Sequence, residues 1–95
     1  MALTTNNQLT LLHDILDEQT ADVTGSTSEY QQIKRLVQSL TENNNITDEQ
    51  LLQLLPEIYD YGSQGEKLQN SPEHITTNKQ NIENWLRAIG QTTLE

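Results

Sequence analysis

The residues of this sequence that could do chemistry are two histidines and three carboxylates close to the first of them. His13 and Asp17 are four residues apart, and so are Asp14 and Glu18, so each pair would share one face of a helix. Two ligands do not complete a metal site, and only the tertiary fold could bring His74 close to His13. A polar helix face explains the spacing more simply, and we therefore expect no metal site.

An anion site is the second chemical candidate. The run from Gly25 to Ser28 offers backbone N–H groups and three hydroxyls at the predicted start of a helix. Glu29 opposes an anion there, and with Ser26 it forms a capping box, so a capped helix start is the favoured interpretation. The sequence has no cysteine, no nucleophile beside a recognisable base and no Gly-rich phosphate loop after a strand. We therefore expect a protein that is not an enzyme and needs no cofactor.

Length and charge restrict the remaining classes. The 95 residues suit a single helical domain covering residues 1–95. Fourteen acidic against five basic residues give a net charge of −9, which repels nucleic-acid phosphates and anionic membranes. The carboxylates are scattered rather than clustered, so a well-solvated surface is the simpler account of them. With no signal peptide and no apolar run long enough to span a membrane, a cytoplasmic location is expected.

Apolar residues at helical spacing predict four helices and no strands. The predicted helices run from about Asn7 to Glu18, from the Ser26 cap to about Glu42, from Ile46 to Tyr61, and from Pro72, with Ser71 as N-cap, to Gly90. The last of them has a gap in its apolar face near Asn78 and Lys79. Residues 62–70 are predicted to be a flexible connector in which only Leu68 touches the core. The predicted fold is therefore all-α, a compact bundle of four helices.

The third helix carries the densest run of large apolar residues in the chain. Thr47 is its predicted N-cap, with Gln50 as the capping-box partner. A step of about 100° per residue places its apolar residues within an arc of about 180°, wider than one packed neighbour needs. Pro56 removes a backbone hydrogen bond from the middle of the segment and is predicted either to kink it or to split it, which would give five helices.

The surplus apolar surface of the third helix predicts an interface. Its candidate residues are Leu54, Ile58 and Tyr61, and we expect Leu54 and Tyr61 to reach solvent together at one border of the arc. The Tyr61 hydroxyl is expected to reach water. The alternatives are that the connector covers the patch, or that Pro56 turns the two halves of the helix toward different neighbours. Trp85, the only tryptophan, is predicted to be buried against this helix.

Four short blocks stand out along the chain, namely residues 11–16 (LLHDIL), 25–29 (GSTSE), 35–40 (RLVQSL) and 57–61 (EIYDY). In that order and spacing they resemble the YtzH-like family, small cytosolic proteins of Bacillus and its relatives. The resemblance covers nearly the whole chain and implies a bacterial cytosolic protein. It brings no activity, cofactor, partner or functional residue.

These features favour a non-enzymatic interaction or regulatory protein that binds an unknown protein partner or a second copy of itself. The alternative is an acidic decoy for a basic or nucleic-acid-binding partner, without direct contact to nucleic acid or membrane. Salt separates the two interpretations, because a decoy complex weakens steeply with ionic strength and an apolar one does not.

Overall fold

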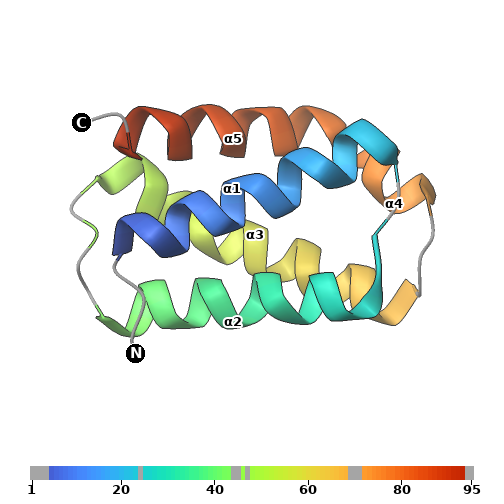
Figure 1. Ribbon diagram of the computed structural model, residues 1–95, viewed down its shortest axis with the longest axis horizontal. Helices are drawn as coiled ribbons and strands as arrows, with labels where there is room; N and C mark the ends of the chain where they lie inside the picture. The colour runs from blue at the N-terminus through green and yellow to red at the C-terminus, as the bar shows by residue number, and fades with distance from the viewer. Residues whose placement is uncertain (1–4, 24, 44–45, 47, 69–71, 94–95) are drawn as a thin grey trace.

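The structure, a computed structural model, describes residues 5–23, 25–43, 46, 48–68 and 72–93. Within these residues there are five helices and no strand, the helices being α1 (Thr5–Asp22), α2 (Thr27–Asn43), α3 (Glu49–Leu68), α4 (Pro72–Thr77) and α5 (Lys79–Thr93). The four long helices lie side by side with alternating direction, and the short α4 lies at one end of the bundle (Figure 1). The prediction of an all-α bundle is confirmed. Among the described residues, no helix combines the length and the apolar character needed to cross a lipid bilayer.

The long helices form a ring around one hydrophobic core. α2 packs most extensively on α3 and α1 on α5, while contacts of α1 with α2 and of α3 with α5 complete the ring. Each long helix contributes fully buried side chains, among them Leu12, Ile33, Leu55 and Ile89. Burying an aliphatic side chain of this size stabilises the fold by about 1.5–3 kcal/mol. This shared core therefore holds the four helices in fixed positions.

Trp85 lies where the sequence predicted it, in the core against α3. Its side chain is 2% exposed, and its ring meets that of Tyr61 edge-on, with centroids 5.5 Å apart. The prediction for Leu68 is wrong, because this residue is 53% exposed instead of touching the core.

α3 is one continuous helix with Pro56 inside it. Of the two alternatives at Pro56, a kink or a split, the split is excluded, and the predicted end of the helix before residue 62 is wrong. Pro56 is exposed, so water can solvate the carbonyl group that loses its helical partner. Residues 62–68 are helical instead of forming a flexible connector, because Gly62 and Gly65 are both buried against side chains of α2, whereas residues 69 and 70 of the predicted connector lie outside the described residues. Tertiary packing thus outweighs the weak helix propensity of glycine.

The fifth helix arises because the predicted fourth helix is divided at Asn78, with α4 ending just before this residue and α5 beginning just after it. The Asn78 side chain donates from Nδ2 to the His74 carbonyl oxygen at 2.9 Å and accepts from Asn81 at its Oδ1, 3.3 Å away. This division falls in the predicted gap of the apolar face. The predicted end at Gly90 is wrong, because α5 continues to Thr93.

The start of α2 is the predicted capping box. Ser26 Oγ accepts from the Glu29 N–H at 3.2 Å, and Glu29 Oε1 accepts from the Ser26 N–H at 3.3 Å. α4 begins at Pro72 as predicted, whereas its predicted cap, Ser71, lies outside the described residues.

The start of α3 differs from its prediction. Asp48 is the N-cap, since its Oδ1 accepts from the N–H groups of Gln50 at 2.9 Å and Leu51 at 3.3 Å. A carboxylate is the stronger acceptor and is also favoured by the positive N-terminal end of the helix dipole. The predicted cap, Thr47, lies outside the described residues.

α1 is longer than predicted, because it does not end at Glu18. It extends to Asp22 because Gln19, expected in a loop, is 1% exposed and makes hydrogen bonds to two other helices. The chain then leaves the helix through Val23, whose φ of 51° is in the left-handed region that β-branched residues rarely adopt.

Candidate binding groove

The predicted interface residues are not exposed together. Ile58 and Tyr61 are 0% and 2% exposed, and Leu54 is partly buried against the same core. Most of the wide apolar arc of α3 is covered, because α2 and α5 both pack on this helix and a ring from α4, that of His74, stacks on Tyr61, whereas Leu52 is 38% exposed. The expectation that Leu54 and Tyr61 reach solvent together is therefore wrong.

Leu54 keeps a place at the surface, at the edge of a hollow between α3 and α5. Polar side chains make up most of this hollow, whose lining residues are Gln50, Leu54, Asn84, Arg87, Ala88 and Gln91. Because water satisfies amide and guanidinium groups well, this hollow offers little apolar surface to a partner.

The metal candidates are not assembled into a site. Among the described residues, no group of three or more His, Asp or Glu side chains is placed to hold a metal ion. His13 Nδ1 lies 3.6 Å from Asp14 Oδ1, so it faces its chain neighbour rather than Asp17. The anion candidate at Gly25 to Ser28 is occupied by the capping box described above.

His74 is a buried polar residue whose role the sequence did not indicate. It is 6% exposed and stacks on Tyr61, with ring centroids 4.6 Å apart and planes 11° apart, while Tyr30 meets it edge-on. Its Nε2 lies 2.9 Å from the carbonyl oxygen of Tyr61, which makes this nitrogen the donor. His74 therefore ties α4 to α3.

The Tyr61 hydroxyl is buried instead of reaching water. It donates to Gln19 Oε1 at 2.7 Å, and Gln19 Nε2 donates to Glu29 Oε1 at 3.3 Å, which links α1, α2 and α3. Burial raises the pKa of Tyr61 far above its ordinary value, and the adjacent Tyr30 adds to this shift. These hydrogen bonds join protein groups to one another, so we interpret the cluster of Gln19, Glu29 and Tyr61 as structural, holding the three helices in place.

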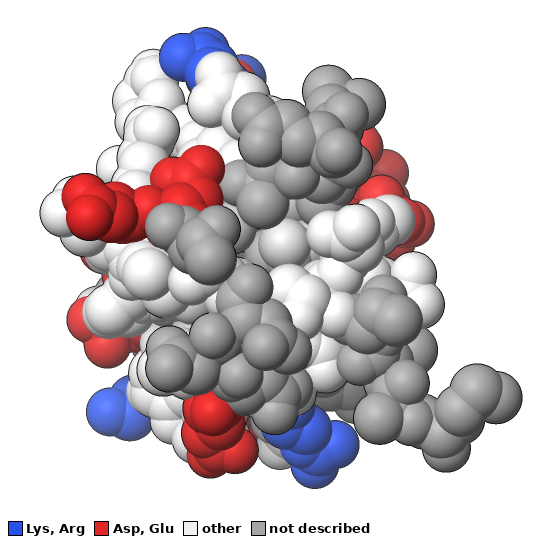
Figure 2. Space-filling view, turned by 90° about the vertical axis from the view of Figure 1, so that its left-hand side faces the viewer, with Lys and Arg blue, Asp and Glu red and all other residues white. Residues whose placement is uncertain are grey.

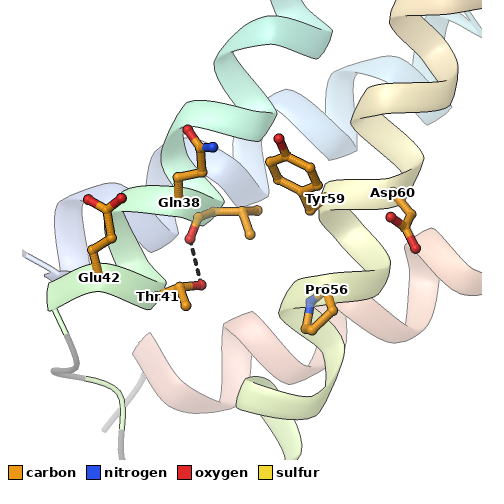
Figure 3. Close-up of a pocket in the computed structure, with 7 residues that line it drawn as sticks. Gln38, Thr41, Glu42, Pro56, Tyr59 and Asp60 are labelled. Atoms are coloured by element: carbon orange, nitrogen blue, oxygen red, sulfur yellow. Dashed lines mark hydrogen bonds between the residues drawn. The ribbon is translucent and has the colours of Figure 1, made fainter.

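A surface groove of about 360 Å³ lies between α2 and α3. It mixes apolar and polar side chains, its lining residues being Val37, Gln38, Thr41, Glu42, Pro56, Tyr59 and Asp60. Tyr59 points from α3 toward α2, while Glu42 and Asp60 lie at the two outer edges (Figure 3). We call this surface the α2–α3 groove.

The spacing of the two helices explains why a groove forms there. At Gly62 the backbones approach closely, because a methyl group on this residue would lie 3.2 Å from the Tyr30 carbonyl oxygen. Toward the C-terminal end of α2, the residues of α3 beside the contact are the larger Pro56 and Tyr59, which line the groove. The small residues at one end of the contact thus leave a groove at the other end.

The α2–α3 groove has an apolar floor and an open top. Val37 is buried and Tyr59 is half-buried, whereas Thr41, Pro56 and the two carboxylates are exposed. The Thr41 hydroxyl donates to the Val37 carbonyl oxygen at 2.8 Å (Figure 3). Because its proton is already used within α2, this hydroxyl can only accept hydrogen bonds from a ligand.

The charge of the α2–α3 groove is negative. Glu42 and Asp60 are both exposed, and none of the lining residues is Lys or Arg. Lys34, one turn before the groove on α2, pairs with Glu66 at 2.6 Å. The hydrogen bond between them raises the pKa of Lys34 and lowers that of Glu66. The charge of Lys34 is therefore balanced locally instead of offsetting the carboxylates of the groove.

Negative charge alone does not distinguish this surface from the rest of the protein. On the face drawn in Figure 2, acidic side chains occur in several separate groups with uncharged surface between them. The α2–α3 groove differs because its carboxylates border apolar side chains that a partner can cover.

Sequence reasoning did not predict the groove, because its residues come from two helices whose relative placement was unknown. Two signals pointed toward it. Tyr59 lies at a border of the apolar arc of α3, and Pro56, which leaves one helical carbonyl without its usual N–H partner, is favoured where water can reach the backbone. Neither signal identifies Val37 or Thr41 as the facing residues.

The fold and the groove define a small all-α bundle with an acidic, apolar-floored surface groove. Sequence comparison identifies the family of the chain. The family described as YtzH-like protein matches residues 3–89, and the chain belongs to this family. The resemblance seen in the four sequence blocks is confirmed. The chain is similar to the uncharacterized protein YtzH of Bacillus subtilis (strain 168), with 29% identity over 89 residues that cover 94% of this chain and 96% of that protein. No solved structure matches the chain.

Proposed function

We propose that this protein is a small, non-enzymatic, cytoplasmic interaction module that binds a protein partner through the α2–α3 groove. The observation that carries the proposal is the groove itself, in which Val37 and Tyr59 form an apolar floor between exposed polar edges. Apolar surface with a polar rim is the usual anatomy of a protein interface. A half-buried tyrosine suits this role, because its ring packs while its hydroxyl can bond to water or to the partner.

The proposal places the interface on a different side of α3 from the one predicted. Ile58 and Tyr61 belong to the core, where they fix the rotation of α3 about its axis. That rotation presents Pro56 and Tyr59 toward α2 and solvent. Ile58 and Tyr61 therefore support the groove without contacting the partner, and Leu54 lies outside the groove, in the hollow between α3 and α5.

The acidic decoy is the second candidate function, and the net charge of −9 is the observation that favours it. A decoy would bind a basic partner over its whole surface, so substitution of Tyr59 would leave the affinity unchanged. Its complexes would also weaken steeply as salt is added. Dependence on a single groove residue separates the two functions.

Site-specific photo-crosslinking tests the proposal. The photoreactive residue p-benzoylphenylalanine replaces Tyr59, or, as a matched control, the exposed Glu83 of α5, and the chain is expressed in a Bacillus host. We expect protein adducts from position 59 that excess wild-type protein suppresses and excess Tyr59→Ala protein does not. Position 83 should give none of these adducts. The same adducts from both positions, or none from position 59, would refute the proposed function.

A further inference from the structure

We infer that the occupant of the α2–α3 groove is a cationic, apolar-centred segment of another protein, with one or two apolar side chains flanked on both sides by Lys or Arg. The inference rests on the proposed function and adds the chemistry of the partner. Its basis is the charge, the hydrogen-bonding polarity and the size of the groove.

Charge complementarity is the first argument. Glu42 on α2 and Asp60 on α3 lie at the outer edges of the groove, Asp60 on the side of α3 turned away from α2 (Figure 3), and no basic residue lines the groove. Of the two cations that precede the groove on α2, Lys34 is paired with Glu66, and Arg35 lines a different hollow, with Leu11 and Leu36. A segment with a cation on each side of its apolar residue meets both carboxylates, whereas an acidic segment meets like charge on both sides. Such rim charges contribute mainly to specificity and to the association rate.

Hydrogen-bonding polarity points the same way. The carboxylates can only accept, and the Thr41 hydroxyl has already donated its proton to Val37. Lys and Arg side chains carry donors and no acceptors, so they complement the two carboxylates and the Thr41 hydroxyl. Gln38 and Tyr59 can donate as well as accept and add no preference.

Size and openness favour a side chain of a larger molecule over a free small ligand. The volume of about 360 Å³ is near the lower limit of the roughly 300–1,000 Å³ that small-molecule pockets occupy. Because Thr41, Glu42, Pro56 and Asp60 are exposed, the groove cannot enclose a ligand. It can receive one or two apolar side chains that project from a partner.

The overall charge argues against the other macromolecular occupants. Nucleic acids and anionic membranes would meet both the groove carboxylates and a chain of net charge −9. A second copy of the chain carries the same charge, so self-association through this groove would bring two acidic surfaces together. A basic segment of a different protein is the occupant that electrostatics favours.

The experiment compares three short fluorescein-labelled peptides that share a central pair of leucines and are flanked on both sides by Lys, by Gln or by Glu. Fluorescence anisotropy measures the affinity of each for the full chain. We expect the Lys peptide to bind about tenfold or more tightly than the Gln peptide, and the Glu peptide to bind more weakly than either. Tyr59→Ala should lower the affinity for the Lys peptide by about tenfold, as truncation of an aromatic anchor does.

Matched variants assign the preference to the groove. The double variant Glu42→Gln and Asp60→Asn should remove most of the preference for the Lys peptide over the Gln peptide. The pair Glu18→Gln and Glu83→Gln removes the same charge from exposed sites on α1 and α5 and should leave the preference intact. Thr41→Arg keeps the apolar floor and adds a cation, so it should lower the affinity for the Lys peptide. This variant tests the groove if Tyr59→Ala proves too unstable to study. Circular dichroism and thermal melting verify the fold of each variant.

The experiments distinguish a failure of the cationic inference from a failure of the proposed function. If the Gln peptide binds as tightly as the Lys peptide and both depend on Tyr59, the cationic inference is overturned and the interaction module stands. If the Lys peptide binds regardless of Tyr59 and follows total charge, the groove is refuted and the decoy is supported. If none of the peptides binds, the inference is overturned, and photo-crosslinking from position 59 decides the proposed function independently.

Discussion

Substituting Gly65 with alanine tests the close packing of α2 on α3 that shapes the groove. A methyl group on Gly65 would collide with the Tyr30 ring, lying 2.5 Å from Cδ1 and from Cζ and closer still to Cε1. Ordinary carbon contacts are about 3.5–4.0 Å, so the ring would have to move by about 1 Å. Tyr30 is 1% exposed and meets the rings of Tyr61 and His74, with centroids 5.7 and 5.8 Å away. The ring therefore has no free space to enter.

Two opposing effects determine how much Gly65→Ala changes the free energy of unfolding. Alanine gains about 0.5–1 kcal/mol over glycine in a helix interior. Overpacking of a core costs about 1–3 kcal/mol, and an overlap with three ring atoms belongs at the upper end of that range or above it. We expect Gly65→Ala to lose about 2 kcal/mol of unfolding free energy, which lowers the Tm by about 8–16 °C for a chain of this size.

Gly90→Ala is the matched control, because it makes the same change inside α5, where a methyl group would meet nothing within 4 Å. It should gain about 0.5–1 kcal/mol from helix propensity alone. Urea unfolding followed by far-UV circular dichroism measures both variants. If Gly65→Ala were as stable as the wild type or more stable, the Tyr30 ring would not pack on Gly65, and the reasoning would be refuted.

Four further predictions follow from other features of the fold. Val23→Gly should raise the unfolding free energy by about 1 kcal/mol, because glycine adopts a positive φ without strain. Alanine does not, so Val23→Ala should bring no such gain. Tyr61→Phe should lose about 1–3 kcal/mol at neutral pH because Gln19 loses its donor. Since burial raises the folded pKa of Tyr61, its contribution is present below the ordinary tyrosine pKa of 10.0 and is lost as the pH rises above it, so the variant should lose stability less steeply there. The ion pair lowers the folded pKa of Glu66, so its contribution is present above the ordinary pKa of 4.5 and is lost as the pH falls, and Glu66→Gln should flatten the acid limb of the stability curve. If residues 1–95 form a single domain, as we propose, the fluorescence of the only tryptophan should shift to the red in one denaturation step shared with helicity.

Each of these has a clear contrary result. A lower Tm for Val23→Gly than for Val23→Ala would contradict the left-handed conformation. Unchanged alkaline and acid limbs in the Tyr61 and Glu66 variants, measured by urea unfolding across the pH range, would contradict the assigned partners. Separate transitions for fluorescence and circular dichroism would contradict the single domain.

The sequence predicted the features of this fold that depend on local signals. The Ser26 and Glu29 capping box was predictable because its partners are three residues apart and need no tertiary contact. The continuation of α3 through Gly62 and Gly65 was not, because these glycines read as a linker until Tyr30 is known to pack on them. Local composition cannot show that a neighbouring helix stabilises such a segment.

The candidate site was predictable only in part for the same reason. The sequence identified the apolar residues of α3, but which of them are covered depends on tertiary contacts such as that of His74, a polar residue that reaches the core from α4. The groove depends on Val37 and Tyr59 meeting across two helices, and their sequence separation hides that contact. Interface predictions from one helix therefore identify apolar surplus without showing which part of it remains exposed.

The most direct test of the central claim is to map the Lys-flanked peptide on the ¹⁵N-labelled protein by amide chemical shifts. The α2–α3 groove as binding surface predicts the largest changes at the amides of Val37, Thr41 and Tyr59, with little change at Leu54 and Ala88 in the hollow between α3 and α5. Changes that are largest at Leu54 and Ala88, or that spread evenly over all acidic residues, would contradict it.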